Sequence, residues 1–307
     1  MKYIHPWRIY GKIRLTMYRI FWFCLYHFVP DFIYYHIKYR KKTGKKLHLR
    51  HPKTLNEKMH WLKMYYRKPI MTLLADKYKA KDYIRENIGE QYVVPTLTVY
   101  KKVKEIDWDS LPNQFVLKCN HDSSGNVICR DKSKLSVKDA IFKLNWRLKQ
   151  NYYYWVDKQW AYKDIPPRII LEPLLQNSDG SPFVDYKFFC YGGKLRYFMY
   201  SLGEAEHQVR NVKLDPQKNI IDQYFRKNIQ IPPEDIKLPD NIDEMIAIAE
   251  EQGKKFPCLR LDMFNVDGHI YIGEFTFYPN GGFINIYSEE YSQKLADMID
   301  INSLKKK

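Results

Sequence analysis

The sequence predicts an α+β protein whose sheets are mainly antiparallel. Apolar, strand-like segments occur as neighbouring pairs joined by short polar or glycine-containing turns, as in β-hairpins. The predicted order is helices, hairpin, helix, strand, hairpin, helix and hairpin, which is typical of an α+β protein. Neither a Gly-x-Gly-x-x-Gly nor a Walker A pattern is present. The 307 residues suffice for a sizeable core and one or two domains.

Helices are predicted before the first hairpin. The segment from Thr54 to Glu57 has the capping-box pattern and opens a helix with apolar residues on one face. A second helix is predicted over residues 73–88, because Gly89 follows as a helix stop. Residues 93–99 then form an edge or entry strand, since a proline lies within this apolar run.

The first hairpin pairs residues 114–119 with residues 126–130. The segment Ser123-Ser124-Gly125 forms its small, polar tip. A helix is predicted from Ser136 through the tyrosine-rich stretch near Tyr154. A further apolar strand covers residues 168–175.

The C-terminal half contains two more strand pairs. Residues 183–200 form a pair around Gly192-Gly193. A helix capped at Asn241 runs to about residue 252. Residues 259–277 form the last hairpin, which turns at Asp267-Gly268. Consecutive strands joined by short turns pair antiparallel, which gives the predicted fold class.

Positive charge is concentrated at the N-terminus. Residues 1–50 contain twelve Lys or Arg and one acid, Asp31, so this sixth of the chain holds most of the net charge of +16. Such an uneven distribution indicates a local patch and argues against a nucleic-acid binder that uses its whole surface. The five cysteines are odd in number, scattered and never spaced as C-x-x-C. They argue against a disulfide framework or a zinc site and predict a reducing, cytoplasmic location.

The N-terminal segment, residues 7–38, interleaves large apolar and basic residues. Its uncharged run from Ile20 to Val29 is too short to span a membrane, and no signal-peptide cleavage site follows. Two interpretations remain open. A basic, aromatic helix can lie in a membrane interface, held to anionic lipid by the basic cluster within residues 40–50. Alternatively, the helix packs on the folded domain and its basic side chains are solvated.

The last hairpin carries the clearest chemistry. Arg260 and Asp262 lie on one strand, Glu274 and Thr276 lie on its partner, and alternate residues share a face. Paired carboxylates on adjacent strands suit Mg²⁺ held between phosphate oxygens. Arg260 would stabilise a negatively charged intermediate from the same face. The alternative is an ordinary salt bridge between Arg260 and Glu274.

The first hairpin carries the second candidate site. Lys118 lies in an otherwise apolar strand, where a lysine needs an anionic partner. The Ser123-Ser124-Gly125 tip offers backbone N–H groups that suit a phosphate. The alternative is a lysine that extends to solvent beside an ordinary turn. Asp185 and Lys187 lie on one strand face, again with a simple ion pair as the alternative.

Five segments in this order resemble the ATP-grasp superfamily, and more closely its TupA-like branch, which is found in bacterial polysaccharide gene clusters. The resemblance covers roughly residues 53–283. The resembling segments are Leu55-Asn56-Glu57-Lys58, Ala75-Asp76-Lys77-Tyr78, Phe115-Val116-Leu117-Lys118-Cys119-Asn120-His121, Asp185-Tyr186-Lys187-Phe188 and Gly273-Glu274-Phe275-Thr276-Phe277-Tyr278-Pro279.

The resemblance implies an ATP-grasp fold in which two α+β subdomains with mainly antiparallel sheets clasp ATP, preceded by a basic-aromatic helical segment. The implied divisions are residues 1–52 for that segment, 53–112 for a helical part of the ligase, 113–172 for the small subdomain with its flexible hairpin loop, and 173–307 for the C-terminal subdomain with the metal site. Many relatives have a full α/β domain before the first ATP lysine, whereas only 76 residues precede Lys77 here. The substrate-binding half is therefore expected to be reduced or different.

The resemblance also assigns expected nucleotide contacts. Lys77 and Lys118 would contact the ATP phosphates, and the Ser123-Ser124-Gly125 tip would close over them. Adenine and ribose would lie against the segment from Glu172 to Leu175. Asp185 corresponds to the ribose-binding acid of the family, and Lys187 to the phosphate- or substrate-binding base that follows it.

The metal site departs from the family pattern at one position. Asp262 and Glu274 would hold Mg²⁺, and Arg260 would stabilise the acyl phosphate and the tetrahedral intermediate. Many relatives carry Asn where this chain has Thr276, and a hydroxyl is a poorer Mg²⁺ ligand than an amide oxygen. Either Asn280 would replace that ligand or the second metal would bind more weakly.

The implied function is an ATP- and Mg²⁺-dependent carboxylate–amine ligase that forms an amide through an acyl phosphate. Its substrates would belong to a bacterial surface glycan or a lipid-linked precursor, at the cytoplasmic face of the membrane. Two other classes stay open. A glycosyltransferase of the same pathway would use the aromatic stretch Tyr152 to Trp155 to stack on sugars, and a non-catalytic binder of polyanions would use residues 1–50.

Overall fold

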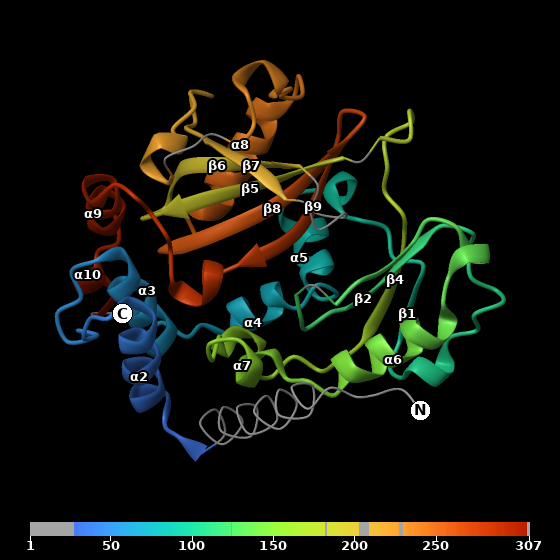
Figure 1. Ribbon diagram of the computed structural model, residues 1–307, viewed down its shortest axis with the longest axis horizontal. Coiled ribbons are helices and arrows are strands. Elements are labelled where there is room, and N and C mark those ends of the chain that lie inside the picture. Colours follow the sequence, from blue (N-terminus) through green and yellow to red (C-terminus); the bar gives the residue numbers. More distant parts are fainter. Residues whose placement is uncertain (1–27, 124, 182, 203–208, 227–229, 306–307) are drawn as a thin grey trace, which may run out of the picture.

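The computed structural model describes residues 28–123, 125–181, 183–202, 209–226 and 230–305. It confirms the predicted α+β class with two mainly antiparallel sheets (Figure 1). A small sheet has the strand order β1-β4-β2-β3, and a large sheet has the order β7-β6-β5-β8-β9.

The elements follow one another along the chain with short connections. The helices are α2 (Asp31–Thr43), α3 (Leu55–Tyr65), α4 (Pro69–Ala75), α5 (Ala80–Asn87), α6 (Val137–Leu148), α7 (Tyr152–Trp155), α8 (Ile242–Gly253), α9 (Glu289–Asp297) and α10 (Ile301–Lys305). The strands are β1 (Thr98–Tyr100), β2 (Phe115–Cys119), β3 (Val127–Cys129), β4 (Ile169–Pro173), β5 (Val184–Tyr191), β6 (Lys194–Leu202), β7 (Arg210–Leu214), β8 (Cys258–Val266) and β9 (His269–Thr276).

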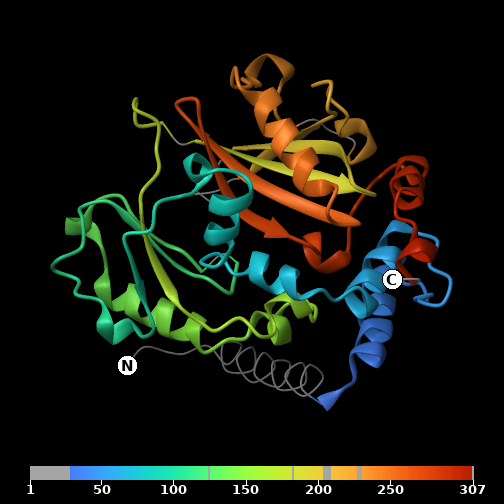
Figure 2. The ribbon, with the colours of Figure 1, turned by 180° about the vertical axis from the view of Figure 1, so that it is seen from behind.

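The small sheet buries one face against α6, which covers it in both ribbon views (Figures 1 and 2). Phe115, Leu117 and Cys119 of β2 pack in one core with Ala140 and Leu144 of α6. Successive strand residues point to opposite faces, so the side chain of Lys118, between Leu117 and Cys119, points away from α6. Lys118 is the lysine of the predicted site.

One face of the large sheet is covered by α8, which contacts β5, β6 and β8 (Figure 1). Tyr186 and Phe188 of β5 lie opposite Met263 and Leu261 of β8, and all four are buried. Alternation then sends Lys187 of β5 to the face that α8 does not cover. This second face carries the predicted metal acids.

The helix predicted over residues 73–88 is two helices, and this part of the prediction was wrong. The chain leaves the helix between α4 and α5, where Asp76 Oδ1 accepts the Tyr78 backbone N–H at 2.9 Å. The backbone N–H of Lys77 donates to the carbonyl of Asn120 at 3.0 Å, outside any helix. A contact with a distant strand therefore breaks the helix, and the break orients Lys77.

Two further helix predictions needed correction. The helix predicted from Ser136 through Tyr154 ends at α6, and α7 starts anew because the Asn151 side chain accepts the Tyr153 N–H at 3.0 Å. Asn241 precedes α8 without a side-chain capping bond, since its amide donates to the Gly268 carbonyl at 2.7 Å.

The hairpins and the capping box match the sequence predictions. Thr54 and Glu57 form the capping box of α3 with both reciprocal hydrogen bonds. The last hairpin turns at Asp267 and Gly268, both of which have positive φ, as a tight two-residue hairpin turn requires. Strand β7 and the helices α9 and α10 were not predicted.

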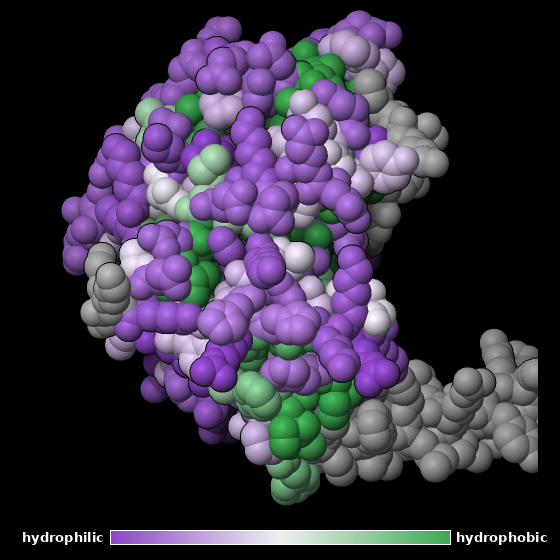
Figure 3. Space-filling view, turned by 90° about the vertical axis from the view of Figure 1, so that its left-hand side faces the viewer, coloured by the Kyte–Doolittle hydropathy of each residue, from purple (hydrophilic) through white to green (hydrophobic). Residues whose placement is uncertain are grey.

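Helix α2 is the described part of the N-terminal segment, and residues 7–27 of that segment lie outside the described residues. Tyr34, Tyr35 and Tyr39 of α2 are buried in the main core, so this helix packs on the domain. Phe32 and Ile33 are about half exposed, and Figure 3 shows an apolar patch at this lower edge of the molecule. Every helix among the described residues is too short or too polar to cross a lipid bilayer.

We predict that Asn120→Ala destabilises the protein by roughly 2–3 kcal/mol, because it leaves several buried polar groups without partners. The Asn120 amide donates to Asp76 Oδ1 at 2.9 Å and to the Pro166 carbonyl at 3.1 Å, and it accepts the Arg168 N–H at 2.7 Å. Urea unfolding measures the change. The exposed Asn302→Ala is the matched control, and equal stability of the two variants would contradict the prediction.

Candidate functional site

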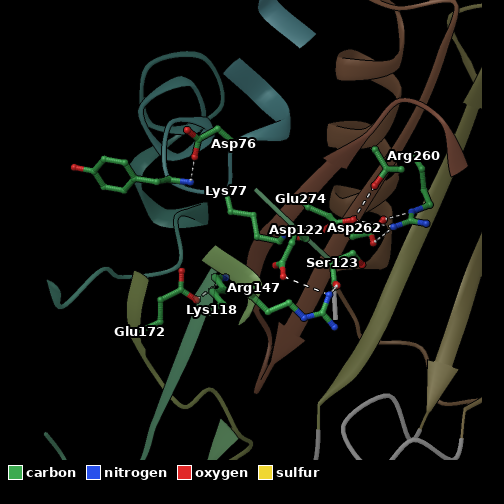
Figure 4. A network of polar contacts seen from close by, with 12 residues as sticks. Asp76, Lys77, Lys118, Asp122, Ser123, Arg147, Glu172, Arg260, Asp262 and Glu274 are labelled. Carbon is green, nitrogen blue, oxygen red and sulfur yellow. Dashed lines mark hydrogen bonds and ion pairs between the residues drawn. The ribbon is translucent and has the colours of Figure 1, made fainter. Parts of the chain in front are cut away.

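The candidate site lies between the uncovered faces of the two sheets. Figure 4 shows side chains that converge there from β2, β4, the turn between α4 and α5, β8 and β9. They are linked by hydrogen bonds and ion pairs that join segments far apart in the sequence. The site thus depends on tertiary structure, although hairpin alternation sets the direction of several of its side chains.

Lys118 has the anionic partner that its apolar strand requires. Its Nζ lies 2.6 Å from Glu172 Oε2, and Lys81 Nζ of α5 lies 2.6 Å from Glu172 Oε1. Glu172 is therefore engaged by two lysines in this arrangement. All three side chains are largely buried, so one carboxylate faces two ammonium groups and positive charge is in excess. Burial lowers the pKa of Lys81.

Lys77 joins three parts of the site. Its Nζ donates to the backbone carbonyl of Asp122 and lies 3.2 Å from Glu274 Oε2 (Figure 4). Burial opposes the charge of Lys77, but the nearby Glu274 carboxylate outweighs burial and raises the pKa of this lysine. The lysine is thus held as a cation at the point where the hairpin tip meets β9.

The hairpin tip carries a carboxylate that the sequence analysis missed. The Asp122 side chain is only 3% exposed and neither of its oxygens has a hydrogen-bond partner. Arg147 Nη1 of α6 lies 3.7 Å from Asp122 Oδ2 and donates to the Ser123 carbonyl at 3.5 Å. Burial raises the pKa of the Asp122 carboxyl.

The tip glycine is required by close packing. A Cβ on Gly125 would lie 2.2 Å from Asp122 Oδ2, so a larger residue would displace the buried carboxylate. Ser123 lies in the described tip, whereas Ser124 lies outside the described residues.

The two predicted metal acids are neighbours across the last hairpin. Asp262 is the register partner of Glu274, and Arg260 is the partner of Thr276. Arg260 contacts Asp262 at 2.6 and 2.7 Å and Glu274 at 2.9 Å, so the predicted salt bridge is present in this structure. The Thr276 hydroxyl donates to Glu274 Oε1 at 2.8 Å.

The electrostatics of this pair suit a divalent cation. Burial and the neighbouring carboxylate raise the pKa of Asp262 to about 7. Burial also acts on Glu274, but Lys77 and Arg260 prevail and lower the pKa of that acid to about 2. Two buried carboxylates side by side need counter-charge, which Mg²⁺ with its preference for carboxylate oxygens can supply. The described residues contain no cluster of three or more His, Cys, Asp or Glu, so further ligands would be phosphate oxygens or water.

Asp185 and Lys187 lie on the same face as the metal acids. Lys187 of β5 is the register partner of Asp262, and Lys187 Nζ forms an ion pair with Asp185. The ion pair between Asp185 and Lys187, which was the alternative interpretation, is therefore present and lies next to Asp262.

Two predicted residues lie at the margin of the site. Leu175 is in the loop after β4 and is half-buried. Asn280 is in the short helix η7 (Pro279–Gly282), where its side chain is exposed. Among the described contacts, none joins the Asn280 side chain to Asp262 or Glu274.

Lys81, Asp122 and Arg147 belong to the site and were not predicted. Lys81 follows Lys77 by four residues, a spacing that places two residues on the same face of a continuous helix. Lys77 lies outside the helices here, so the spacing does not predict where Lys81 points. Asp122 directly precedes the Ser-Ser-Gly tip, which was a usable signal. Arg147 reaches the tip from α6, and nothing local in the sequence indicates this contact.

Several solved structures are distantly similar to this chain. A D-alanine–D-alanine ligase of Bacillus anthracis in complex with ATP is 19% identical, with a TM-score of 0.44 over 76% of this chain and 67% of that chain. A D-alanine–D-alanine ligase of Helicobacter pylori is 15% identical, with a TM-score of 0.42 over 80% and 69%. An L-amino acid ligase of Bacillus licheniformis is 11% identical, with a TM-score of 0.42 over 78% and 55%. Similarity at this level supports no conclusion about activity.

The family to which this chain belongs is shown by a family model. No curated protein matches the sequence. The TupA-like ATP-grasp family model matches residues 57–300, which is most of the chain and includes both sheets. The predicted resemblance and the predicted ATP-grasp fold are confirmed. This chain belongs to the TupA-like ATP-grasp family and is an ATP-dependent ligase.

Proposed function

We propose that this protein uses ATP and Mg²⁺ to join a carboxylate to an amine through an acyl phosphate. One observation carries the proposal: Lys77 Nζ lies 3.2 Å from Glu274 Oε2, which brings a phosphate-binding lysine against a metal acid. A lysine next to a paired carboxylate site suits a phosphoryl group that bridges the cation and a metal ion.

The proposed reaction has two steps. An oxygen of the substrate carboxylate attacks the γ-phosphorus of ATP, the bond to the β-phosphate oxygen breaks, and ADP leaves. The amine nitrogen then attacks the acyl carbon, a C–N bond forms, and phosphate leaves as the nitrogen loses its proton. Mg²⁺ at Asp262 and Glu274 would neutralise charge on the transferred phosphoryl group. The protein residues mainly position the groups and balance their charges.

The ion pairs within the cleft would be exchanged when the nucleotide binds. Lys77 and Lys118 are now neutralised by Glu274 and Glu172, and phosphate oxygens would take over that role. Glu274 would then be free to bind the metal ion. Each exchange replaces one buried ion pair by another, so charge stays balanced throughout.

Arg260 would act on the reacting acyl group. Its guanidinium is buried and its pKa is raised by the carboxylates of Asp262 and Glu274, although burial opposes this. It remains a cation throughout and would stabilise the oxyanion of the tetrahedral intermediate. Lys187 lies one strand away and would hold the phosphate or the substrate.

The substrate and location are also part of the proposal. We infer a bacterial surface glycan or a lipid-linked precursor as substrate, processed at the cytoplasmic face of the membrane. The TupA-like resemblance supports this inference. Helix α2 also supports it, since half-exposed Phe32 and Ile33 are followed in the chain by the basic run from Arg40 to Lys46 (Figure 3).

The tyrosine-rich stretch gives little support to the glycosyltransferase alternative. Tyr153 donates its hydroxyl to Asp31 Oδ1 at 2.6 Å, and the Tyr152 ring packs against Tyr162 at 4.8 Å between centroids. Both tyrosines therefore contact neighbouring parts of the protein and pack α7 against them. We therefore retain the ligase as the proposed function.

Lys77→Met should raise the Kd for ATP at least about tenfold, because a charge-assisted hydrogen bond to phosphate contributes roughly 1.5–3 kcal/mol. Isothermal titration calorimetry with Mg²⁺ and ATP gives the Kd. Lys79→Met is the matched control, since the Lys79 side chain is 57% exposed and lies 3.8 Å from its ion-pair partner Asp82. Wild-type affinity in Lys77→Met, or no ATP binding by the wild type, would refute the proposed function.

Asp122→Asn should tighten ATP binding about threefold to tenfold. The substitution removes a buried negative charge, without a hydrogen-bond partner, from the loop that would cover the phosphates. The same calorimetric titration measures the effect, with the exposed Asp139→Asn as control. Weaker ATP binding would show that Asp122 supports the nucleotide site instead of opposing it.

Thr276→Val should raise the Mg²⁺ concentration needed for half-maximal ATP turnover by roughly tenfold, as expected when the hydrogen-bond partner of a metal ligand is lost. The valine keeps the shape of the side chain but removes the 2.8 Å bond to Glu274 Oε1. Thr98→Val is the control, because Thr98 is exposed on β1 of the small sheet. An unchanged Mg²⁺ requirement would remove Thr276 from the metal site.

A further inference from the structure

The polar face of the large sheet continues beyond the metal acids. Register partners run across all five strands in one row, which comprises Glu274, Asp262, Lys187, Met199 and Lys213. A second row on the same face comprises Asp185, Ser201 and Asn211. The proposed reaction uses these rows only as far as Lys187 and Asp185.

The far end of the two rows carries a partly buried cluster, in which Lys213 and Asp222 are buried and Arg226 is partly exposed. Lys213 Nζ and Arg226 Nη2 both donate to Asn211 Oδ1, at 2.7 and 2.5 Å. Both cations also pair with the fully buried Asp222, at 3.4 and 3.1 Å. Within the described part of the chain, Asp222 is the only acid in ion-pair contact with either cation.

Among the described residues, these two cations share one carboxylate, so the described part of the cluster is one negative charge short. A buried cation without full compensation is costly, and a neutral amide oxygen is a weak substitute for an anionic one. Asn211 Oδ1 thus occupies the place where an oxyanion would satisfy both Lys213 and Arg226.

Ser201 provides an independent indication of a ligand. Its side chain is 1% exposed, and its Oγ has no hydrogen-bond partner. In the sheet register it lies directly between Asp185 and Asn211. Buried hydroxyl groups nearly always have partners, so an orphan beside a cation cluster points to an absent acceptor.

Aromatic rings connect this cluster to the reaction centre. Phe225 lies 5.4 Å from Lys213 Nζ and 4.8 Å from the Tyr197 ring. Tyr197 stacks on Phe189 at 4.5 Å, and Phe189 is the register partner of Arg260. Tyr197 and Phe189 are buried, so these ring contacts pack the sheet between the cluster and Arg260 and fix the two ends relative to one another.

We propose that Ser201, Asn211, Lys213 and Arg226 form a second anion site, which binds a second oxyanion of the acid substrate. This inference rests on the proposed function and names the substrate class. Strands lie about 4.8 Å apart, so three strand spacings place Lys213 roughly 14 Å from Asp262. The acid substrate is therefore an elongated acid, such as an acidic oligosaccharide, with a second carboxylate or a phosphate far from the reacting carboxylate.

Calorimetry on the wild-type chain loaded with Mg²⁺ and the ATP analogue AMP-PNP tests the second anion site. The probes are galacturonate, trigalacturonate, tetragalacturonate and trigalacturonate 1-phosphate, of which the last three are long enough to approach this separation of roughly 14 Å. We expect at least one probe with more than one anionic group to bind roughly tenfold tighter than galacturonate, since a second charge-assisted contact is gained. A preference for the phosphate or for the oligogalacturonates identifies the second group.

Two variants and one control locate the effect. Ser201→Ala breaks no protein hydrogen bond, so it should keep the wild-type Tm yet weaken the preferred probe about threefold to tenfold. Lys213→Met should abolish the preference over galacturonate. Lys218→Met, at a surface lysine paired with Asp243, should bind all probes like the wild type.

The outcomes separate this inference from the proposed function. Absence of AMP-PNP binding refutes the proposed function itself. Normal AMP-PNP binding with no preference for any probe with more than one anionic group overturns the second anion site alone. A loss of AMP-PNP affinity in Ser201→Ala and Lys213→Met, without a change for the probes, also overturns it and assigns these residues to the nucleotide.

Discussion

One buried cation connects the two sheets of this protein. Lys77 donates to the Asp122 carbonyl at the tip of the small-sheet hairpin and pairs with Glu274 on β9 of the large sheet. The lysine can reach both because the chain between α4 and α5 leaves the helix, where its backbone N–H bonds to Asn120. The position of the hairpin, the turn and the metal acids therefore depends on one side chain.

Ion pairs of the same kind balance the lysine charges of the candidate site. Lysines that suit phosphate would repel one another if they were buried together without anions. Glu172 and Glu274 prevent this, since Glu172 lies within ion-pair distance of Lys118 and Glu274 within ion-pair distance of Lys77. Such pairs contribute little net stability because burial is costly for both partners. They can therefore be exchanged for phosphate and metal contacts at small net cost.

Hairpin chemistry was predictable from the sequence, because alternation and turn residues are local signals. Asp262 and Glu274 were expected on one face, and the register places them directly opposite. The break at Asp76 was not predictable, since it depends on Asn120, which directly follows β2 and is distant in sequence. Arg147 was missed for the same reason, because its contact with the hairpin tip is made only in the folded chain.

Helix α3 supports the candidate site from the N-terminal side. Lys63 of α3 is completely buried and donates to the Gly281 carbonyl of η7 at 2.7 Å. Burial lowers the pKa of this lysine to about 7, so the contact with η7 is retained at an electrostatic cost.

Asn56, also in α3, accepts the Ile284 N–H at 2.8 Å, just beyond η7. Both contacts fix the segment that directly follows the metal strand β9. Helix α3 thus holds the end of the hairpin that carries Asp262 and Glu274. Because α2 packs on α3, the exposed apolar and basic surface of α2 is rigidly connected to the metal acids. Helices α2 and α3 therefore support the candidate site from the N-terminal side, through the contacts of α3 with the segment that follows β9.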